Sequence, residues 1–163
     1  MKKRLFLIRH AEAENNNFDV KDIERVLTQN GEIVASKVGK ALTEVVGKPH
    51  LIMASNSIRT RQTAELIAEQ LEYQADSIIY REELYEASAR ILLGEINRLP
   101  ASSSDVLLIA HNPAIPYLAE YITGEIIGGV SPAGIVEVAY DGDWMEISEK
   151  SVQFIKYHVP PTA

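Results

Sequence analysis

Apolar residues along the chain follow two alternating patterns: short buried runs and longer stretches with helical spacing. Runs that are nearly continuous in apolar residues, but too short for a helix, predict buried strands. Stretches whose apolar residues recur at steps of three and four predict amphipathic helices. The predicted strands are 4–9, 50–55, 77–80 and 105–111, and the predicted helices are 28–46, 57–71, 88–99 and 113–123.

The last part of the chain is richer in strand signals than in helix signals. Residues 134–140 alternate between apolar and polar, which is typical of a half-buried strand, and residues 141–144 read as a turn. Residues 144–148 and 152–159 predict two further strands. We therefore expect strands to continue after the last helix.

Several helix ends carry residues that start or stop helices. Thr28 and Ser57 are candidate N-caps, because a hydroxyl can accept a hydrogen bond from a free amide of the first turn. Pro113 suits the first turn of a helix, whereas Gly47 and Gly124 suit helix termination. These signals support the predicted bounds.

Strand and helix patterns alternate four times along the chain. This alternation predicts an α/β fold, a three-layer α/β/α sandwich with a mostly parallel central sheet. In such sheets, ligands bind outside the carboxyl ends of the strands. With 163 residues and no linker-like stretch, we expect one domain over 1–163.

Composition excludes several classes of protein. No apolar run approaches the roughly 18 residues that a membrane span needs, and the first residues do not resemble a signal peptide. The net charge is -7 without a Lys/Arg cluster, so we expect neither a nucleic-acid partner nor a membrane partner. The sequence has no cysteine, which excludes thiol catalysis and thiolate metal sites and fits a cytoplasmic protein.

Cationic side chains stand where three predicted strands end. The first strand ends in Arg9 and His10, the second leads into a helix whose first turn holds Arg59, and another ends in His111. Parallel strands bring these ends to one edge of the sheet, next to the positively polarised N-termini of the following helices. Guanidinium groups, imidazoles and backbone amides together suit a phosphoryl group.

Each of these residues alone has an ordinary structural interpretation. A single histidine at a strand end is more often a hydrogen-bonded structural residue, and an arginine near a helix start is usually a solvated charge. Their joint occurrence favours a site, because cations gathered at a buried edge repel one another unless an anion offsets them.

Four segments of the chain resemble the histidine phosphatase superfamily, also called the phosphoglycerate-mutase-like or RHG family. They occur in the family's order, with Arg9 and His10 in the signature, Arg59 at the phosphate-binding arginine and His111 at the second histidine. The matching segments are "FLIRHAEAE" (6–14), "RVLTQNG" (25–31), "ASNSIRTRQTAELI" (54–67) and "LLIAHNP" (107–113). The resemblance implies a phosphoglycerate-mutase-like fold.

Within that superfamily the chain looks most like the SixA-like branch of phosphohistidine phosphatases. The resemblance rests on the short length, on "ELYEAS" (83–88), and on "HNP" where larger members tend to carry "HG". Only about two dozen residues separate Glu86 from His111, which leaves no room for a large inserted lid. An open site suits a phosphate displayed on a protein. Ala11 departs from the family's "RHG", and "SNS" (55–57) from its "SSP".

The resemblance implies catalysis through a covalent phosphohistidine on His10. A neutral imidazole is the nucleophile in such a reaction. Arg9, Arg59 and His111 are implied to hold the three equatorial phosphoryl oxygens in the transition state. The resemblance also implies an acid for the leaving group, for which Glu86 is the best match and Glu83 the alternative.

The need for that acid depends on the substrate. Imidazole is a far better leaving group than an alkoxide, so a phosphohistidine phosphatase tolerates a weakly placed acid. Arg25 and Asn15–Asn17 lie near the signature and are candidates for the mouth of the site, although polar loop residues are usually only solvated. We expect no metal and no cofactor, because no metal-binding motif occurs and a cationic pocket repels divalent ions.

The leading hypothesis is a metal-independent phosphatase acting on phosphohistidine in a protein, for example a histidine-phosphorylated signalling protein. Two alternatives stay open: a small-molecule phosphomonoesterase of the same fold, and a non-catalytic phosphate-binding module. A nucleotide-binding domain is disfavoured, because neither GxGxxG nor GxxxxGK[ST] occurs.

Overall fold

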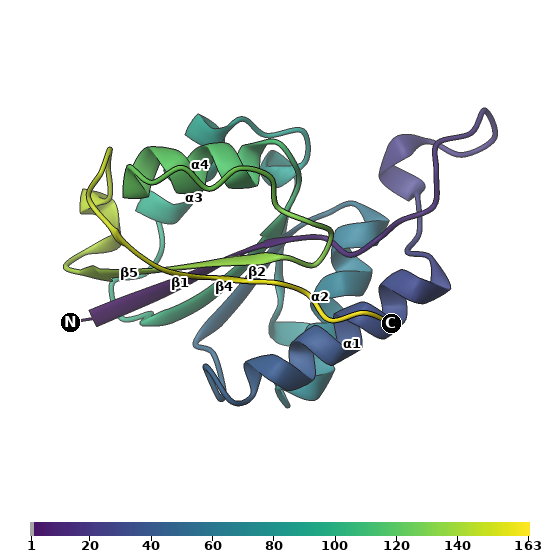
Figure 1. Ribbon diagram of the computed structural model, residues 1–163, viewed down its shortest axis with the longest axis horizontal. Helices are drawn as coiled ribbons and strands as arrows, with labels where there is room; N and C mark the ends of the chain where they lie inside the picture. Colours follow the sequence, from purple (N-terminus) through teal and green to yellow (C-terminus); the bar gives the residue numbers. More distant parts are fainter. Residues whose placement is uncertain (1) are drawn as a thin grey trace.

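The computed structural model describes residues 2–163, which fold around one six-stranded sheet (Figure 1). The strand order is β3-β2-β4-β1-β5-β6. The first four strands in this order are parallel, and β5 is antiparallel to both of its neighbours, β1 and β6. The strands are β1 (Lys2–Arg9), β2 (Leu51–Ser55), β3 (Ile79–Arg81), β4 (Asp105–Ala110), β5 (Ile135–Asp141) and β6 (Gln153–His158). The predicted mostly parallel sheet is confirmed.

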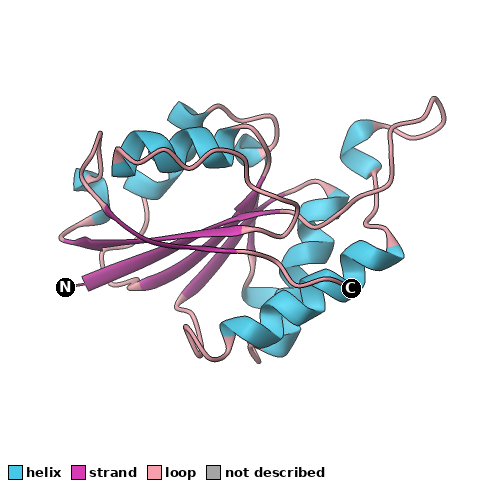
Figure 2. Ribbon diagram, in the orientation of Figure 1, coloured by secondary structure: helices cyan, strands magenta, loops and turns pink. Residues whose placement is uncertain are grey.

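Two pairs of helices cover the two faces of this sheet (Figures 1 and 2). α1 and α2 pack together on one face, and α3 and α4 pack together on the other. The α-helices are α1 (Gln29–Leu42), α2 (Ile58–Gln70), α3 (Ala89–Asn97) and α4 (Ala114–Thr123), and the short 3-10 helices are η1 (Asp22–Glu24), η2 (Ala75–Ser77), η3 (Glu82–Leu84) and η4 (Trp144–Glu146). The predicted three-layer sandwich is thus observed.

The continuous apolar runs follow from this layering. Successive residues of a strand point to opposite faces, so a sheet covered on both sides needs apolar residues at every position. In β1, Leu5 and Leu7 join the core beneath α3 and α4, whereas Phe6 and Ile8 join the core beneath α1 and α2. All four are at most 1% exposed.

The predicted caps are present. The Thr28 hydroxyl accepts a hydrogen bond from the Gly31 amide at the start of α1, and the Ser57 hydroxyl accepts one from the Thr60 amide at the start of α2. α1 is shorter than predicted, since it ends at Leu42 and residues 43–46 form turns. The Thr43 hydroxyl donates to the Lys40 carbonyl, and this local bond is an alternative to continuing the helix.

The predicted strand over residues 144–148 is wrong, because this segment begins with the 3-10 helix η4. Asp143 and Glu146 form a capping box there, each side chain accepting a hydrogen bond from a backbone amide at the start of the turn. The indole of Trp144 is fully buried and donates to the Ser103 carbonyl. Local capping and burial of one indole therefore outweigh the strand propensity of the segment.

β5 is more buried than its alternating sequence predicts. Residues 135–139 are all buried, because β5 lies between β1 and β6 and carries core residues on both faces. Glu137 is buried there, and its carboxylate accepts a hydrogen bond from Nε2 of His158 at 2.8 Å. His158, near the C-terminus, thus pairs with the buried acid.

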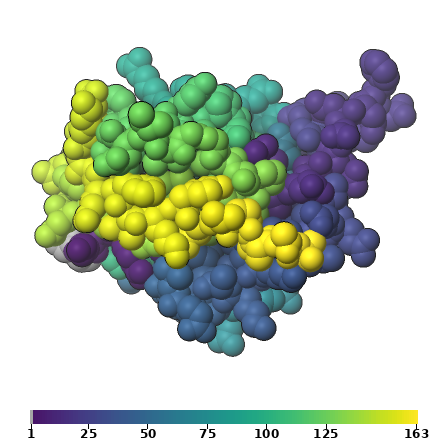
Figure 3. Space-filling view, in the orientation of Figure 1, coloured from purple at the N-terminus to yellow at the C-terminus, as the bar shows by residue number. Residues whose placement is uncertain are grey.

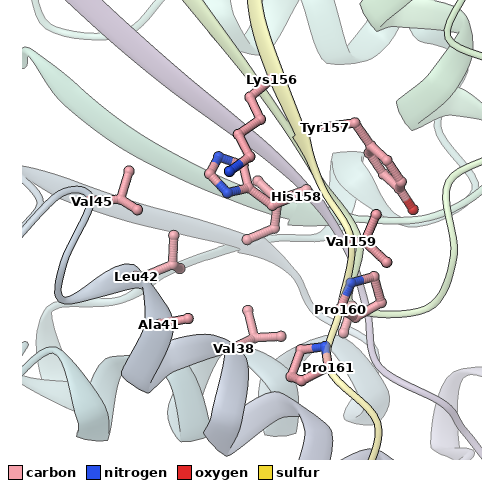
Figure 4. A pocket seen from close by; sticks show the side chains of 12 residues that line it. Val38, Ala41, Leu42, Val45, Lys156, Tyr157, His158, Val159, Pro160 and Pro161 are labelled. Carbon is pink, nitrogen blue, oxygen red and sulfur yellow. The ribbon is translucent and has the colours of Figure 1, made fainter.

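The C-terminal tail lies across α1, which leaves a groove between them (Figure 4). The ammonium group of Lys37 on α1 donates to the Thr162 carbonyl at 3.0 Å. Val38 and Leu42 line the groove from α1, and Pro160 and Pro161 line it from the tail. The groove measures about 320 Å³ and shares no lining residue with the site described next.

Candidate active site

A pocket of about 260 Å³ lies at the carboxyl ends of the parallel strands. The register of β1 and β4 pairs Arg9 with Ala110, so the next residues, His10 and His111, leave neighbouring strands side by side. Their ring centroids are 5.3 Å apart. The pocket is lined by Arg9, His10, Arg25, Arg59, Tyr85, Glu86, His111 and Asn112.

His10 is a buried, neutral imidazole with a defined tautomer. Its Nδ1 lies 2.7 Å from the Ala11 carbonyl oxygen, which can only accept, so Nδ1 carries the proton and Nε2 keeps its lone pair. The pKa of His10 is lowered to about 4, mainly by burial and further by the charges of Arg59, Arg9 and Arg25, against the opposing effect of the Ala11 hydrogen bond. The imidazole of His10 is therefore unprotonated near neutral pH, the state that a nucleophilic histidine requires.

A serine on β2 sets the tautomer of His111. The backbone amide of Ser57 donates to the Ser55 hydroxyl oxygen at 3.3 Å, and the same oxygen lies 2.9 Å from Nε2 of His111. The direction of this hydrogen bond decides the tautomer: donation from Ser55 to Nε2 places the imidazole proton on Nδ1, whereas donation from Nε2 to Ser55 leaves Nδ1 as an acceptor for Arg59. Burial, with the charges of His10 and Arg59, lowers the pKa of His111 to about 3.

Hydrogen-bond donors converge at this pocket. Nη2 of Arg59, which can only donate, lies 3.5 Å from Nδ1 of His111. The Nε atoms of Arg9 and Arg59 are buried without a hydrogen-bond partner in the described part of the chain. Buried unpaired donors are costly, and an anion among them would satisfy several at once. The site is thus organised to bind an oxyanion.

Asp22 and Tyr85 complete the site, and the sequence analysis assigned neither of them a role. Arg59 donates from Nη1 to the Asp22 carbonyl at 2.8 Å and from Nη2 to its carboxylate at 3.1 Å. The same carboxylate accepts from the Tyr85 hydroxyl and from Nη1 of Arg25. The Tyr85 hydrogen bond, followed by those arginines, holds the pKa of Asp22 far below its usual range. Asp22 therefore stays charged and fixes two arginines.

Tyr85 links this carboxylate to the second histidine. Its ring meets the His111 ring edge-on, with centroids 5.6 Å apart. Burial and the neighbouring Asp22 carboxylate raise the pKa of Tyr85 to about 12. The phenol is therefore a lasting donor to Asp22.

The two candidate acids differ in position. Glu86 lines the pocket and is exposed, with a backbone φ of 55°, a conformation uncommon outside glycine. Glu83 does not line the pocket, and its carboxylate lies 3.6 Å from the guanidinium of Arg81. Arg25 does line the pocket, whereas Asn15–Asn17 line an adjoining hollow of about 490 Å³ that also includes Arg25.

Residues 2–163 contain no cluster of three His, Asp or Glu side chains placed to hold a metal ion. Within the same residues, no helix combines the length and the apolar character needed to cross a membrane. The donor set of the pocket consists of guanidinium, imidazole and hydroxyl groups. These groups suit an anion rather than a cation.

Two histidines and three arginines line one small pocket at a sheet edge, a set of groups that suits a phosphoryl group. The family model described as "Histidine phosphatase superfamily (branch 1)" matches residues 5–96, more than half of the chain. The chain therefore belongs to the histidine phosphatase superfamily, as its sequence motifs predicted.

Three solved structures described as phosphohistidine phosphatase SixA share the fold. A candidate SixA from Nakamurella multipartitia has a TM-score of 0.84 and 24% identity, covering 98% of this chain and 97% of that one. A candidate SixA from Agrobacterium tumefaciens has a TM-score of 0.82 and 23% identity over 97% and 98% of the two chains. A SixA complexed with tungstate has a TM-score of 0.81 and 22% identity over 94% and 95%. The prediction of a SixA-like member is confirmed at the level of the fold.

Two curated relatives are themselves uncharacterised. A chloroplastic protein of Arabidopsis thaliana is 34% identical over 70 residues, which are 43% of this chain and 32% of that protein. The chain thus matches about a third of that relative's length. A protein of Mycobacterium leprae is 25% identical over 86% of this chain and 90% of its own.

Proposed function

We propose that this protein hydrolyses phosphohistidine on a protein, without a metal, through a covalent intermediate on His10. The observation that carries the proposal is the His10 imidazole, buried and neutral, with Nδ1 tied to the Ala11 carbonyl and Nε2 free to attack. Arg9, Arg59 and His111 line the same small pocket, and Nε of each of these two arginines has no hydrogen-bond partner within residues 2–163.

The first half-reaction moves the phosphoryl group from the substrate to the enzyme. The Nε2 lone pair of His10 attacks phosphorus while the phosphorus–nitrogen bond of the substrate breaks, and the leaving imidazole takes up a proton. Nδ1–H of His111 and the guanidinium groups of Arg9 and Arg59 donate to the three equatorial oxygens, where charge gathers in the transition state.

The second half-reaction regenerates the enzyme. Water attacks the phosphorus of phospho-His10, the bond to Nε2 breaks, and inorganic phosphate leaves with the oxygen of that water. The hydrogen bond from Nδ1 to the Ala11 carbonyl is kept through both steps, so His10 returns to its starting tautomer. Neither half-reaction requires a metal.

The position of Glu86 supports phosphohistidine over an alkyl phosphate. Glu86 lies exposed at the pocket, where it can pass a proton to a leaving group, but no hydrogen bond or ion pair within residues 2–163 holds its carboxylate in place. An alkoxide needs a well-placed acid, whereas imidazole does not. The tungstate complex of the SixA relative adds support, since tungstate is a tetrahedral oxyanion like phosphate.

The proposed partner is a phosphorylated protein, such as a histidine-phosphorylated signalling protein. The fold shared with the SixA structures supports this substrate class. The cytoplasmic location expected from the sequence stays a prediction.

The test compares phosphate release from a phosphohistidine-bearing protein and from p-nitrophenyl phosphate, in the presence of a chelator. His10→Ala should abolish release from both. His50→Ala is the matched control, because His50 is an exposed imidazole that bonds Ser104 and lines no part of the pocket. Equal release by His10→Ala and wild type would remove His10 from the mechanism.

Glu86→Gln separates the two enzymatic alternatives. Under our proposal it slows release from an alkyl phosphate more than release from phosphohistidine. Equal slowing of all substrates would favour the small-molecule phosphomonoesterase. Phosphate binding without any turnover would favour the non-catalytic module.

A further inference from the structure

A finger formed by residues 13–27 projects beyond the active-site edge of the sheet (Figures 1 and 3). Isolated antiparallel bridges close it at two levels, between Ala13 and Leu27 at its base and between Asn17 and Val20 at its tip. In Figure 3 the finger is the purple projection at the upper right. The finger is therefore a built element rather than a loose loop.

The finger exposes large apolar side chains. Phe18, at the tip, is fully exposed, and Val20 and Val26 are exposed as well. Single exposed apolar residues are ordinary on a protein surface, but three on one short projection are a cluster that can bury against a partner. An aromatic side chain at a tip is the kind of residue that anchors interfaces.

The finger is continuous with the phosphoryl pocket. Arg25, within the finger, lines both the active-site pocket and the adjoining hollow along Asn15–Asn17. Nε of Arg25 donates to the Glu14 carbonyl at 2.7 Å, which ties the two sides of the finger together. Asp22, also in the finger, bonds Arg59 in the pocket. A molecule whose phosphate occupies the pocket therefore lies beside the finger.

The size of the pocket limits what it can hold. Its volume of about 260 Å³ is far smaller than a protein domain, so a protein substrate places only its phosphoryl group and the side chain that carries it in the pocket. The rest of a protein substrate has to rest on the surface around the pocket. The finger projects from the surface beside the pocket, so it is well placed to contact the rest of such a substrate.

We propose that the finger is the docking surface for the phosphohistidine-bearing protein, with Phe18 burying against apolar residues next to the phosphorylated histidine. Val20 and Val26 extend the contact, and the amides of Asn15–Asn17 provide neutral hydrogen-bonding groups beside it. This proposal rests on the proposed function and names the surface by which the site selects proteins over small phosphorylated molecules.

The test uses two substrates that share the phosphorus–nitrogen bond. One is a histidine phosphotransfer domain phosphorylated on its surface histidine, and the other is phosphoramidate, which is too small to reach the finger. Phe18→Ser is the test variant, and because Phe18 is fully exposed, the substitution should not affect folding. Ile126→Ser is the matched control, because Ile126 is almost fully exposed in the loop after α4, the helix that leads away from the pocket.

Phe18→Ser should lower kcat/KM for the phosphorylated domain about tenfold or more, mainly through KM, because burying a phenylalanine is worth at least one factor of ten. It should leave phosphoramidate turnover within twofold of wild type. Ile126→Ser should change neither substrate.

Two results overturn the docking surface while leaving the proposed function intact. The first is that Phe18→Ser has the same kcat/KM as wild type for both substrates. The second is that Phe18→Ser lowers kcat/KM equally for both substrates, which would mean that the substitution acts on the pocket itself. If wild type releases phosphate from neither substrate, the proposed function fails and the docking role falls with it.

Discussion

Ser55→Ala tests how the second histidine is prepared for its role. Ser55 is fully buried, and its hydroxyl oxygen accepts from the Ser57 amide and lies 2.9 Å from Nε2 of His111. In the proposed mechanism Ser55 donates to Nε2, so that Nδ1 carries the imidazole proton. Removing the hydroxyl leaves the amide without its acceptor and Nε2 without its donor. His111 is then free to protonate at Nε2, and Nδ1 no longer has to donate to the phosphoryl group.

The size of both effects follows from these contacts. Leaving a buried polar group unpaired costs about 1–3 kcal/mol of stability. Complete loss of one preorganised donor costs about 10²-fold or more in kcat. Because part of the population keeps the Nδ1–H tautomer, we expect a smaller loss, about 10- to 100-fold in kcat.

The assay combines kinetics with nitrogen NMR of the histidines. Wild type should show His111 protonated at Nδ1, Ser55→Ala should show a mixture of tautomers, and Ser55→Thr, which keeps a hydroxyl, should recover part of the activity. Ser88→Ala is the stability control: it removes the N-cap of α3, at about 1 kcal/mol, and should leave kcat unchanged. A wild-type His111 protonated at Nε2, or full activity in Ser55→Ala, would refute the reasoning.

Three further predictions follow from the charges of the site. The pKa values of His10 and His111, about 4 and about 3, lie below the ordinary 6.5, so the unfolded chain binds protons first as the pH falls. The free energy of unfolding should therefore drop between about pH 6.5 and about pH 4, by roughly 3 kcal/mol for His10 alone. Denaturant melts at a series of pH values measure this drop, and a free energy of unfolding that does not change over this range would contradict the prediction. Tungstate or phosphate at a hundred times its Kd should stabilise the fold by about 2.7 kcal/mol in thermal melts, and Arg59→Ala should lose most of that gain. Asp22→Asn should raise the Kd for the oxyanion about fivefold, as measured by titration calorimetry. The Arg59–Asp22 ion pair is worth about 1 kcal/mol, because the Asp22 side chain is 38% exposed. An unchanged Kd would mean that Asp22 does not position Arg59.

The strand-end residues were predictable because the parallel register alone brings them together. Once β1 and β4 are neighbours, the residues after Arg9 and Ala110 have to meet, and these are His10 and His111. The layered fold was predictable for a similar reason, since strands covered on both faces need continuous apolar runs.

Contacts made by loops were not predictable in this way. Asp22 reaches Arg59 across 37 positions of sequence, and Tyr85 reaches Asp22 across 63, and no periodic pattern links such positions. The segment after Asp143 was wrongly predicted as a strand, because its capping box and buried indole act locally. Short-range chemistry and irregular loops therefore limited the sequence-based prediction more than the core did.

The most direct test of the mechanism is to trap the intermediate. Wild-type enzyme mixed with a phosphohistidine-bearing protein, quenched in alkali within one turnover and digested, should carry an acid-labile phosphate on His10 by mass spectrometry. The His10→Ala enzyme should carry none and release none. Turnover by wild type that never labels His10, or a label on another residue, would contradict the account.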